Sequence, residues 1–116
     1  MTRLVSLELR ELGWLLVRNL IAPDSLGLYR AIVAEAGPLP ELGEIFYENG
    51  PKLVRGIAAR ILRKQFKKGM AAIRASTFVQ LVLGDAHLEM TLGYKVPNIE
   101  ARFEQQIEEA IHAALR

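Results

Sequence analysis

The sequence contains no cysteine, which excludes a disulfide framework, a thiolate zinc site and a thiol nucleophile. It has no run of 18 apolar residues, so a membrane-spanning helix is not expected. The N-terminus lacks the basic start, apolar stretch and small-residue cleavage site of a signal peptide. The formal net charge of +2 is too small to indicate nucleic-acid or membrane binding by itself. These absences favour a cytoplasmic protein with no membrane partner.

What is present is a single apolar-rich domain. The chain has 116 residues, of which 51% are hydrophobic, and residues 1–116 are expected to share one core. Apolar residues recur at helical spacing and no sustained alternation predicts a strand, so the fold class is all-α. Five helices are expected, or six if Gly50-Pro51 interrupts the third, because proline removes an amide donor. Their expected ranges are 3–21, 24–36, 41–68, 75–92 and 97–115, with Gly69 and Gly93 just past the third and fourth.

Four of these helices carry one apolar stripe each, which we expect to face the core. The stripes are Val5, Leu9, Leu12, Leu16 and Leu20; Tyr29, Ile32, Val33 and Ala36; Val54, Ile57, Ala58 and Ile61; and Ile99, Phe103, Ile107 and Ile111.

The helix over 75–92 differs because it is apolar over most of its surface. A helix of this kind must be buried on more than one face. One face can pack on its own domain and the other on a twin subunit, with the last two helices of each copy forming a four-helix interface. The alternative is a central helix enclosed within a monomer. The expected interface residues are Val79, Leu83, Ala86, Met90, Phe103, Ile107 and Ile111.

Asp85 and Glu89 lie four residues apart within this apolar helix. An unpaired carboxylate in such a setting costs several kcal/mol, so each needs a partner or a raised pKa. One interpretation is a structural ion pair with an arginine such as Arg30. The other makes the two carboxylates the polar end of a ligand cavity.

Several segments together resemble the C-terminal domain of TetR-family transcriptional repressors of the AefR-like kind. They are Ala-Pro-Asp-Ser-Leu-Gly-Leu-Tyr-Arg (22–30), Ala-Glu-Ala (34–36), Pro-Leu-Pro-Glu-Leu-Gly (38–43), Phe-Tyr-Glu-Asn-Gly-Pro-Lys (46–52), Phe-Val-Gln-Leu-Val-Leu-Gly-Asp-Ala-His-Leu (78–88) and Leu-Gly (92–93). The resemblance implies a homodimer that senses a small molecule. It also implies that the first helix is the end of a longer helix that connects this domain to a helix-turn-helix domain. DNA would be bound only through that helix-turn-helix domain. No match to that domain is found in this sequence.

The resemblance further implies a mechanism and a place for the ligand. A mainly apolar effector would bind one arrangement of the dimer better than another and so shift its geometry. No cofactor is implied. Each candidate could equally be an ordinary core residue. The candidate ligand-binding residues are Trp14, Val17, Ile21, Tyr29, Phe46, Tyr47, Phe78, Val82, Asp85 and Glu89.

Three other functions have features of the sequence in their favour. Residues 52–68 hold seven basic side chains and no acidic one, but no aromatic residues are spaced among them as a nucleic-acid platform requires, which favours a solvated helix end. Glu109 and His112 have a spacing used in helical di-iron proteins, yet the required second pair is missing, so we expect no enzyme and no metal. A helical dimerisation module without a ligand remains the alternative, which a fully packed interior would favour.

Overall fold

The computed structural model describes residues 2–116, and this part of the chain folds into six helices without a strand. The all-α prediction is therefore confirmed, with the third expected helix divided in two. None of the six combines the length and apolar character needed to cross a membrane. The helices are α1 (Thr2–Ile21), α2 (Pro23–Ala36), α3 (Pro40–Asn49), α4 (Pro51–Leu62), α5 (Lys68–Thr91) and α6 (Ile99–Leu115).

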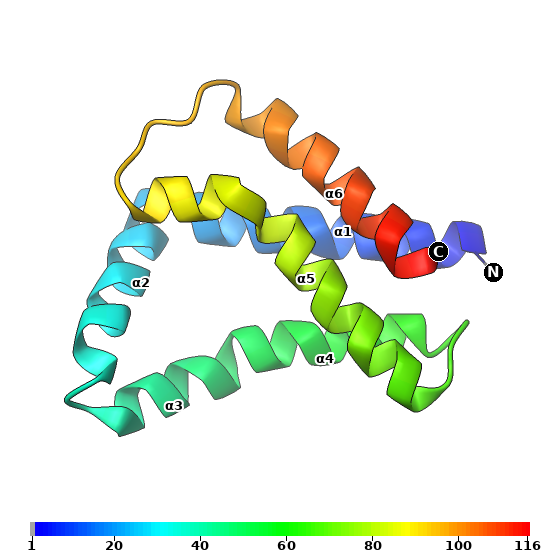
Figure 1. The fold of residues 1–116 in the computed structure, drawn as a ribbon, viewed down its shortest axis with the longest axis horizontal. Helices are drawn as coiled ribbons and strands as arrows, with labels where there is room; N and C mark the ends of the chain where they lie inside the picture. The colour runs from blue at the N-terminus through cyan, green and yellow to red at the C-terminus, as the bar shows by residue number, and fades with distance from the viewer. Residues whose placement is uncertain (1) are drawn as a thin grey trace.

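Proline sets the start of three helices. Pro23, Pro40 and Pro51 each begin a helix. Proline suits the first position because an amide there makes no hydrogen bond within the helix, and because the φ fixed by the proline ring is already helical. The predicted interruption at Gly50-Pro51 is thus a full boundary between α3 and α4. Chain direction changes sharply at the first two of these prolines and only slightly at the third (Figure 1).

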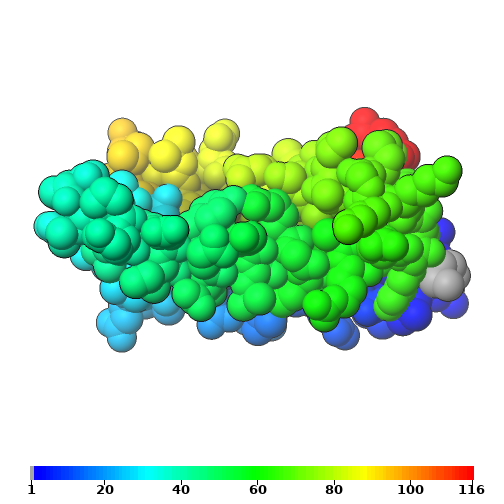
Figure 2. Space-filling model, turned by 90° about the horizontal axis from the view of Figure 1, so that it is seen from below, coloured from blue at the N-terminus to red at the C-terminus, as the bar shows by residue number. Residues whose placement is uncertain are grey.

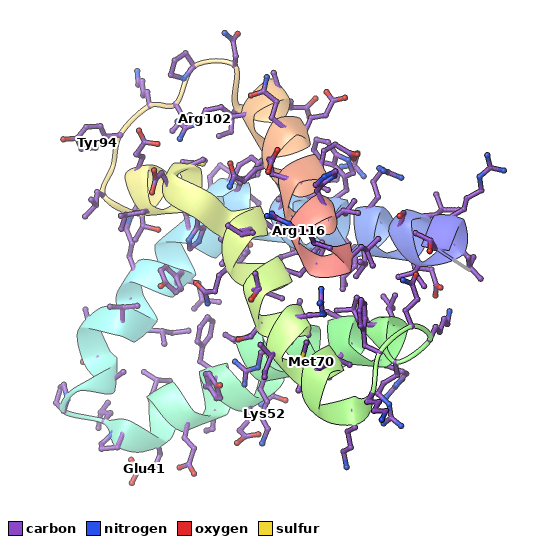
Figure 3. All side chains as sticks on the ribbon, turned by 45° about the vertical axis from the view of Figure 1, so that its right-hand side comes forward. Glu41, Lys52, Met70, Tyr94, Arg102 and Arg116 are labelled. Carbon is purple, nitrogen blue, oxygen red and sulfur yellow. The ribbon has the colours of Figure 1, made fainter. Side chains whose placement is uncertain are left out.

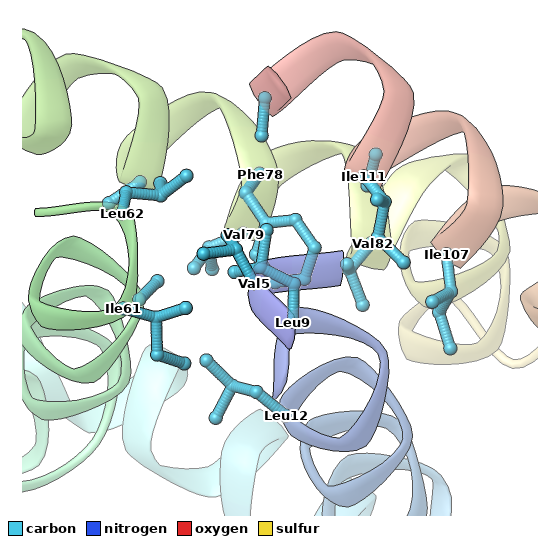
Figure 4. Close-up of a cluster of buried hydrophobic side chains, with 14 of the residues drawn as sticks. Val5, Leu9, Leu12, Ile61, Leu62, Phe78, Val79, Val82, Ile107 and Ile111 are labelled. Carbon is cyan, nitrogen blue, oxygen red and sulfur yellow. The ribbon is translucent and has the colours of Figure 1, made fainter. Parts of the chain in front are cut away.

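The core lies where α1, α4, α5 and α6 meet. Phe78 of α5 is fully buried at its centre, among Leu9 of α1, Leu62 of α4 and Ile107 of α6 (Figure 4). α5 makes its most extensive contacts with α6 and then with α4. Three of the four predicted stripes thus reach this core, although Leu16 and Leu20 of the first are only partly buried. In the α4 stripe, Val54 is partly buried, and Ile57, expected to face inward, is 38% exposed.

The α2–α3 arm, residues 23–49, extends away from this core. Leu26 is its one buried residue, and Val33, expected to face inward, is 58% exposed. α3 contacts only α2 and α4 among the described helices. The molecule is consequently a slab with principal extents of 43 × 34 × 16 Å, seen edge-on with α3 and α4 in front in Figure 2. Because helices are about 10 Å across, few residues of so thin a slab can be covered on both sides.

α5 begins seven residues earlier than the sequence predicted. α4 ends at Leu62, and residues 63–66 form tight turns in which the amide of Gln65 donates to the carbonyl of Leu62 at 3.0 Å. Gly69 therefore lies in the first turn of α5, and its expected place beyond the preceding helix was wrong. The added turns contain Ala71 and Ala75, both fully buried, whose small side chains permit close packing. Gly93, by contrast, follows the end of α5 with φ of +91°, as predicted.

α5 is not one straight helix. At Gly84 the backbone leaves helical geometry with φ of +52° and ψ of −163°, a region open essentially only to glycine. α5 changes direction between its green N-terminal and yellow C-terminal parts (Figure 1). The kink lets the two halves of α5 present different faces to the rest of the chain, so one helical wheel over 75–92 does not describe it.

Candidate functional site

A cavity of about 770 Å³ lies between the core and the α2–α3 arm. Five helices contribute to its wall, and most of the lining side chains are apolar. α1 lines one side, α4 and α5 line others, and the arm supplies Tyr29 and Phe46. The lining consists of Leu12, Leu15, Leu16, Asn19, Leu20, Tyr29, Phe46, Gly50, Pro51, Val54, Arg55, Ile57, Ser76, Val79, Gln80, Leu83, Gly84, Asp85, His87, Leu88 and Thr91.

The outer wall is held by a few specific contacts rather than by a core. Side chains of α2 and α3 project into the space facing α5 in Figure 3, in which Glu41 marks the start of α3. The rings of Tyr29 and Phe46 are tilted against each other with centroids 5.9 Å apart. Arg30 donates to the carbonyl oxygens of Met90 at 2.6 Å and Thr91 at 2.8 Å. These bonds tie the arm to the C-terminal end of α5, where cations suit the helix dipole.

Seven of the 21 lining residues are polar or charged, and three of them have distinct settings. Arg55 donates to the hydroxyl of Tyr47 at 2.5 Å and lies over that ring. Asp85 is exposed and borders the cavity just after the kink. His87 is half-buried, and its shielded Nε2 has no hydrogen-bond partner within residues 2–116. Burial lowers the pKa of His87 below its ordinary value of 6.5, so the imidazole is neutral at pH 7.

Only three of the ten predicted ligand-binding residues line the cavity, namely Tyr29, Phe46 and Asp85. The other seven are placed elsewhere. Val17, Phe78 and Val82 are buried in the core, and Trp14 and Ile21 pack against it. Tyr47 is largely exposed and binds Arg55, whereas Glu89 faces Arg102.

The predicted α1 stripe does not face this cavity. Trp14, Val17 and Ile21 face the core side, and the cavity is lined instead by Leu12, Leu15, Leu16, Asn19 and Leu20. α1 is apolar around more than half of its circumference here, so periodicity alone could not distinguish the core face from the cavity face. One signal was available: Asn19 is a polar residue among leucines, and its amide donates to the carbonyl of Leu15 at 2.8 Å.

Most of the expected interface residues are buried within the protomer. Ala86, Phe103, Ile107 and Ile111 are buried in its own core, and Val79 is buried where it borders the cavity. Leu83 lines the cavity, and Met90 packs partly against the core. Residues without exposed surface cannot contact a twin subunit, so the buried positions are corrected, whereas the half-buried Leu83 and Met90 stay a prediction. The kink at Gly84 is the physical reason, because it turns these side chains of α5 inward. The exposed apolar residues of α5 are Met70, Ile73 and Leu88.

Of the two carboxylates, Glu89 has an arginine partner, but it is Arg102 rather than Arg30. The Nη2 of Arg102 lies 2.7 Å from Oε2 of Glu89, a charge contact whose angles are not those of a hydrogen bond. This contact joins α5 to the first turn of α6, which holds Arg102 and follows the connection that contains Tyr94 (both labelled in Figure 3). Glu89 is therefore paired with Arg102 and lies outside the cavity lining, whereas Asp85 borders the cavity.

The other charged features lie at the surface. In the basic segment, Lys52 pairs with Glu48 at 3.0 Å and Lys64 pairs with Glu8. Glu109 and His112 are both exposed on α6. Across residues 2–116, no three His, Asp or Glu side chains gather as a metal ion would require.

Comparison with known proteins identifies the family. Residues 7–116 match the family model of the AefR-like transcriptional repressor C-terminal domain of TetR-type proteins. This chain is an AefR-like TetR C-terminal domain. The resemblance found in the sequence is thereby confirmed over nearly the whole chain.

The AefR-like domain also has a structural neighbour. A crystal structure from Mesorhizobium loti, described as a TetR-family transcriptional regulator, superposes with a TM-score of 0.73. The two are 20% identical, and the match covers 98% of this chain and 67% of the other. At this identity the likeness establishes the shared all-α fold. Among curated protein sequences, none matches this domain.

Proposed function

We propose that this domain senses a mainly apolar small molecule in the cavity between α1, α4, α5 and the α2–α3 arm, and that it regulates transcription as part of a homodimer in the cytoplasm. The observation that carries the proposal is the cavity itself. Its volume of about 770 Å³ lies within the range of ligand sites, and most of its wall is apolar. A dimerisation module without a ligand would have no need of it.

The construction of the outer wall supports a sensing role. The α2–α3 arm contributes only Leu26 to the buried residues, so its position depends on the hydrogen bonds from Arg30 and on the aromatic contact of Tyr29 with His87 of α5. An element held by so few contacts moves at low free-energy cost. A molecule in the cavity would contact the arm and α5 together, and it would favour the arrangement that it binds best.

Dimerisation is proposed through the outer side of α5 and α6. Met70 and Ile73 of α5 are 47% and 65% exposed and lie outside the cavity lining, so they offer an apolar contact to a second copy. A second copy would cover them. Contact with DNA would belong to a helix-turn-helix domain joined to the N-terminal end of α1, and residues 2–116 would set the spacing of two such domains.

The cavity can be tested with an uncharged fluorescent probe, N-phenyl-1-naphthylamine. Probe emission should rise in a saturable way with the wild-type protein. Val54→Phe would fill part of the cavity and should weaken binding about tenfold or more, by removing the space the probe needs. The matched control is the adjacent Leu53→Phe, which adds the same ring to a residue that is 57% exposed and lies outside the lining. Equal binding by both variants would refute this location.

A further inference from the structure

Arg55 of α4 is the one arginine or lysine among the residues that line the cavity. It is half-buried, and Tyr47 holds its guanidinium in place: the tyrosine hydroxyl accepts a hydrogen bond from Nη2 at 2.5 Å, and the ring centre lies 5.4 Å from Cζ. Within residues 2–116, Arg55 takes part in no ion pair. Its charge is therefore positioned by a neutral aromatic residue and has no carboxylate beside it.

The guanidinium of Arg55 also keeps hydrogen-bond donors open. A guanidinium has five N–H groups, and within residues 2–116 those of Arg55 have the hydroxyl of Tyr47 as acceptor. The nitrogens that are both shielded and unpaired in this part of the chain belong to Arg74 and His87. The remaining nitrogens of Arg55 are thus accessible from outside the protein, at a residue that borders the cavity.

The helices next to Arg55 carry little negative charge. No Asp or Glu occurs between Gly50 and Gly84, so α4 and the part of α5 before the kink contain none. The lining residues of α1 are leucines and Asn19. Pro51, one helical turn before Arg55, lines the cavity as well, and the positive end of the α4 dipole there adds to the attraction that Arg55 exerts on an anion.

Asp85 is the one acidic residue of the lining, and it opposes this attraction only in part. It forms no ion pair with Arg55. Asp85 is exposed whereas Arg55 is half-buried, and water and salt screen an exposed charge more strongly. Asp85 therefore weakens the attraction for an anion but does not neutralise Arg55.

We propose, on the basis of the proposed function, that Arg55 determines the ligand class of the cavity, which is an aliphatic carboxylate such as a fatty-acid anion. The planar guanidinium matches the geometry of a carboxylate and forms charge-assisted hydrogen bonds with it. The alkyl chain then packs on aliphatic lining residues such as Leu16, Leu20 and Leu83. A cavity of about 770 Å³ has room for such a chain.

The test measures displacement of N-phenyl-1-naphthylamine by decanoate, 1-decanol and decylammonium. These compounds share one alkyl chain, and their head groups are negative, neutral and positive. Below the concentrations at which they form micelles, decanoate should displace the probe from the wild-type protein at about tenfold lower concentration than 1-decanol, the preference expected for a charge-assisted hydrogen bond. Decylammonium should bind most weakly, because Arg55 repels it.

Arg55→Met removes the charge and keeps an apolar stem of similar length. This variant should bind decanoate about tenfold more weakly and 1-decanol as the wild type does, which also shows that the cavity is intact. Arg60→Met is the matched control, because it makes the same change at an exposed residue of α4 outside the lining. Asp85→Asn should tighten decanoate binding by no more than about fivefold, because an exposed charge acts weakly.

The protonation of the bound molecule gives a second readout. Decanoate labelled with carbon-13 in its carboxyl group reports its own pKa through the chemical shift. A neighbouring guanidinium favours the charged form, so the pKa of decanoate bound to the wild type should lie below its value in water. In Arg55→Met the apolar wall should raise that pKa above the value in water. A merely structural role of Arg55 would leave the pKa of the bound molecule the same in both proteins.

The outcomes separate this inference from the proposed function. Binding of 1-decanol or decylammonium as tight as that of decanoate, or an unchanged preference in Arg55→Met, would overturn the role of Arg55 while leaving an apolar cavity in place. No saturable binding of the probe itself would contradict the cavity function and this inference together. A preference for decanoate that is lost in Arg55→Met and kept in Arg60→Met, with the shift in pKa, would establish it.

Discussion

The side chain of Gln106 on α6 covers Gly84 at the kink of α5. A Cβ atom built on Gly84 would lie 3.0 Å from Cδ and 3.1 Å from Nε2 of Gln106, closer than side chains normally approach. Gly84 also borders the cavity. Gly84 therefore contacts both the proposed ligand site and α6. A shift of the backbone at this residue would change the cavity and the position of α6, which belongs to the proposed dimer surface, together.

We expect Gly84→Ala to destabilise the domain by roughly 1–3 kcal/mol, since its φ and ψ lie in a region that other residues rarely adopt. The loss should be visible in urea unfolding. The control is Gly56→Ala in α4, where an added Cβ meets no atom within 4 Å and should stabilise the helix by about 0.5–1 kcal/mol. Adding Gln106→Ala should recover little, because a flexible side chain can move whereas the backbone strain stays. Equal stability of Gly84→Ala and the wild type would contradict the kink.

Arg30→Met should loosen the α2–α3 arm without unfolding the core. It removes the two hydrogen bonds to the end of α5 but keeps an apolar stem of similar length. Hydrogen exchange followed by mass spectrometry should show faster exchange over residues 23–49 and unchanged exchange in α1 and α6. The control is Arg60→Met, an exposed position on α4. If both variants exchange alike across the arm, Arg30 does not hold it.

Glu108→Gln should reduce stability at neutral pH and have no effect in acid. Hydrogen bonds from Arg10 at 2.6 and 2.9 Å hold the pKa of Glu108 below its ordinary value of 4.5. Its contribution is therefore present above pH 4.5 and is lost as the pH falls through the lower folded pKa. Both side chains are more than a third exposed, so the effect should stay below about 1 kcal/mol. Unfolding free energies of the variant and wild type should converge once the pH falls below the folded pKa of Glu108. A difference that persists or grows there would contradict the pairing, and Glu104→Gln on the same helix is the control.

Ile73→Glu should shift the proposed dimer toward monomer in sedimentation velocity. Ile73 is 65% exposed on α5, and a charge there would be trapped in an apolar contact between two copies. Leu53→Glu, at an apolar residue of α4 that is 57% exposed, should leave the dimer intact. A wild-type protein that stays monomeric at all concentrations would rule out this surface.

The fold was largely predictable because helix periodicity and proline positions are local signals. Pro23 and Pro51 each mark an observed boundary, and the stripe ending in Phe103, Ile107 and Ile111 is buried. The start of α5 was missed because Gly69 resembles a helix end, although the alanines that follow it favour a helix.

The site was much less predictable. Which apolar face of α1 meets the cavity depends on where the arm folds, a relation between residues far apart in the chain. The kink at Gly84 also could not be inferred, since a glycine within a helix often stays helical, and here Gln106 of another helix packs over it. A wheel drawn straight through Gly84 therefore placed Val79 and Ala86 at a dimer interface, although both are buried in the protomer.

The central claim is that the cavity between the core and the arm takes up an apolar molecule. The most direct measurement is a set of intermolecular nuclear Overhauser effects between butylbenzene and the methyl groups of the wild-type protein. We predict contacts to Leu16, Leu20 and Val54, which line the cavity. Contacts confined to exposed methyl groups such as those of Leu53 and Ile73, or no contacts at all, would contradict it.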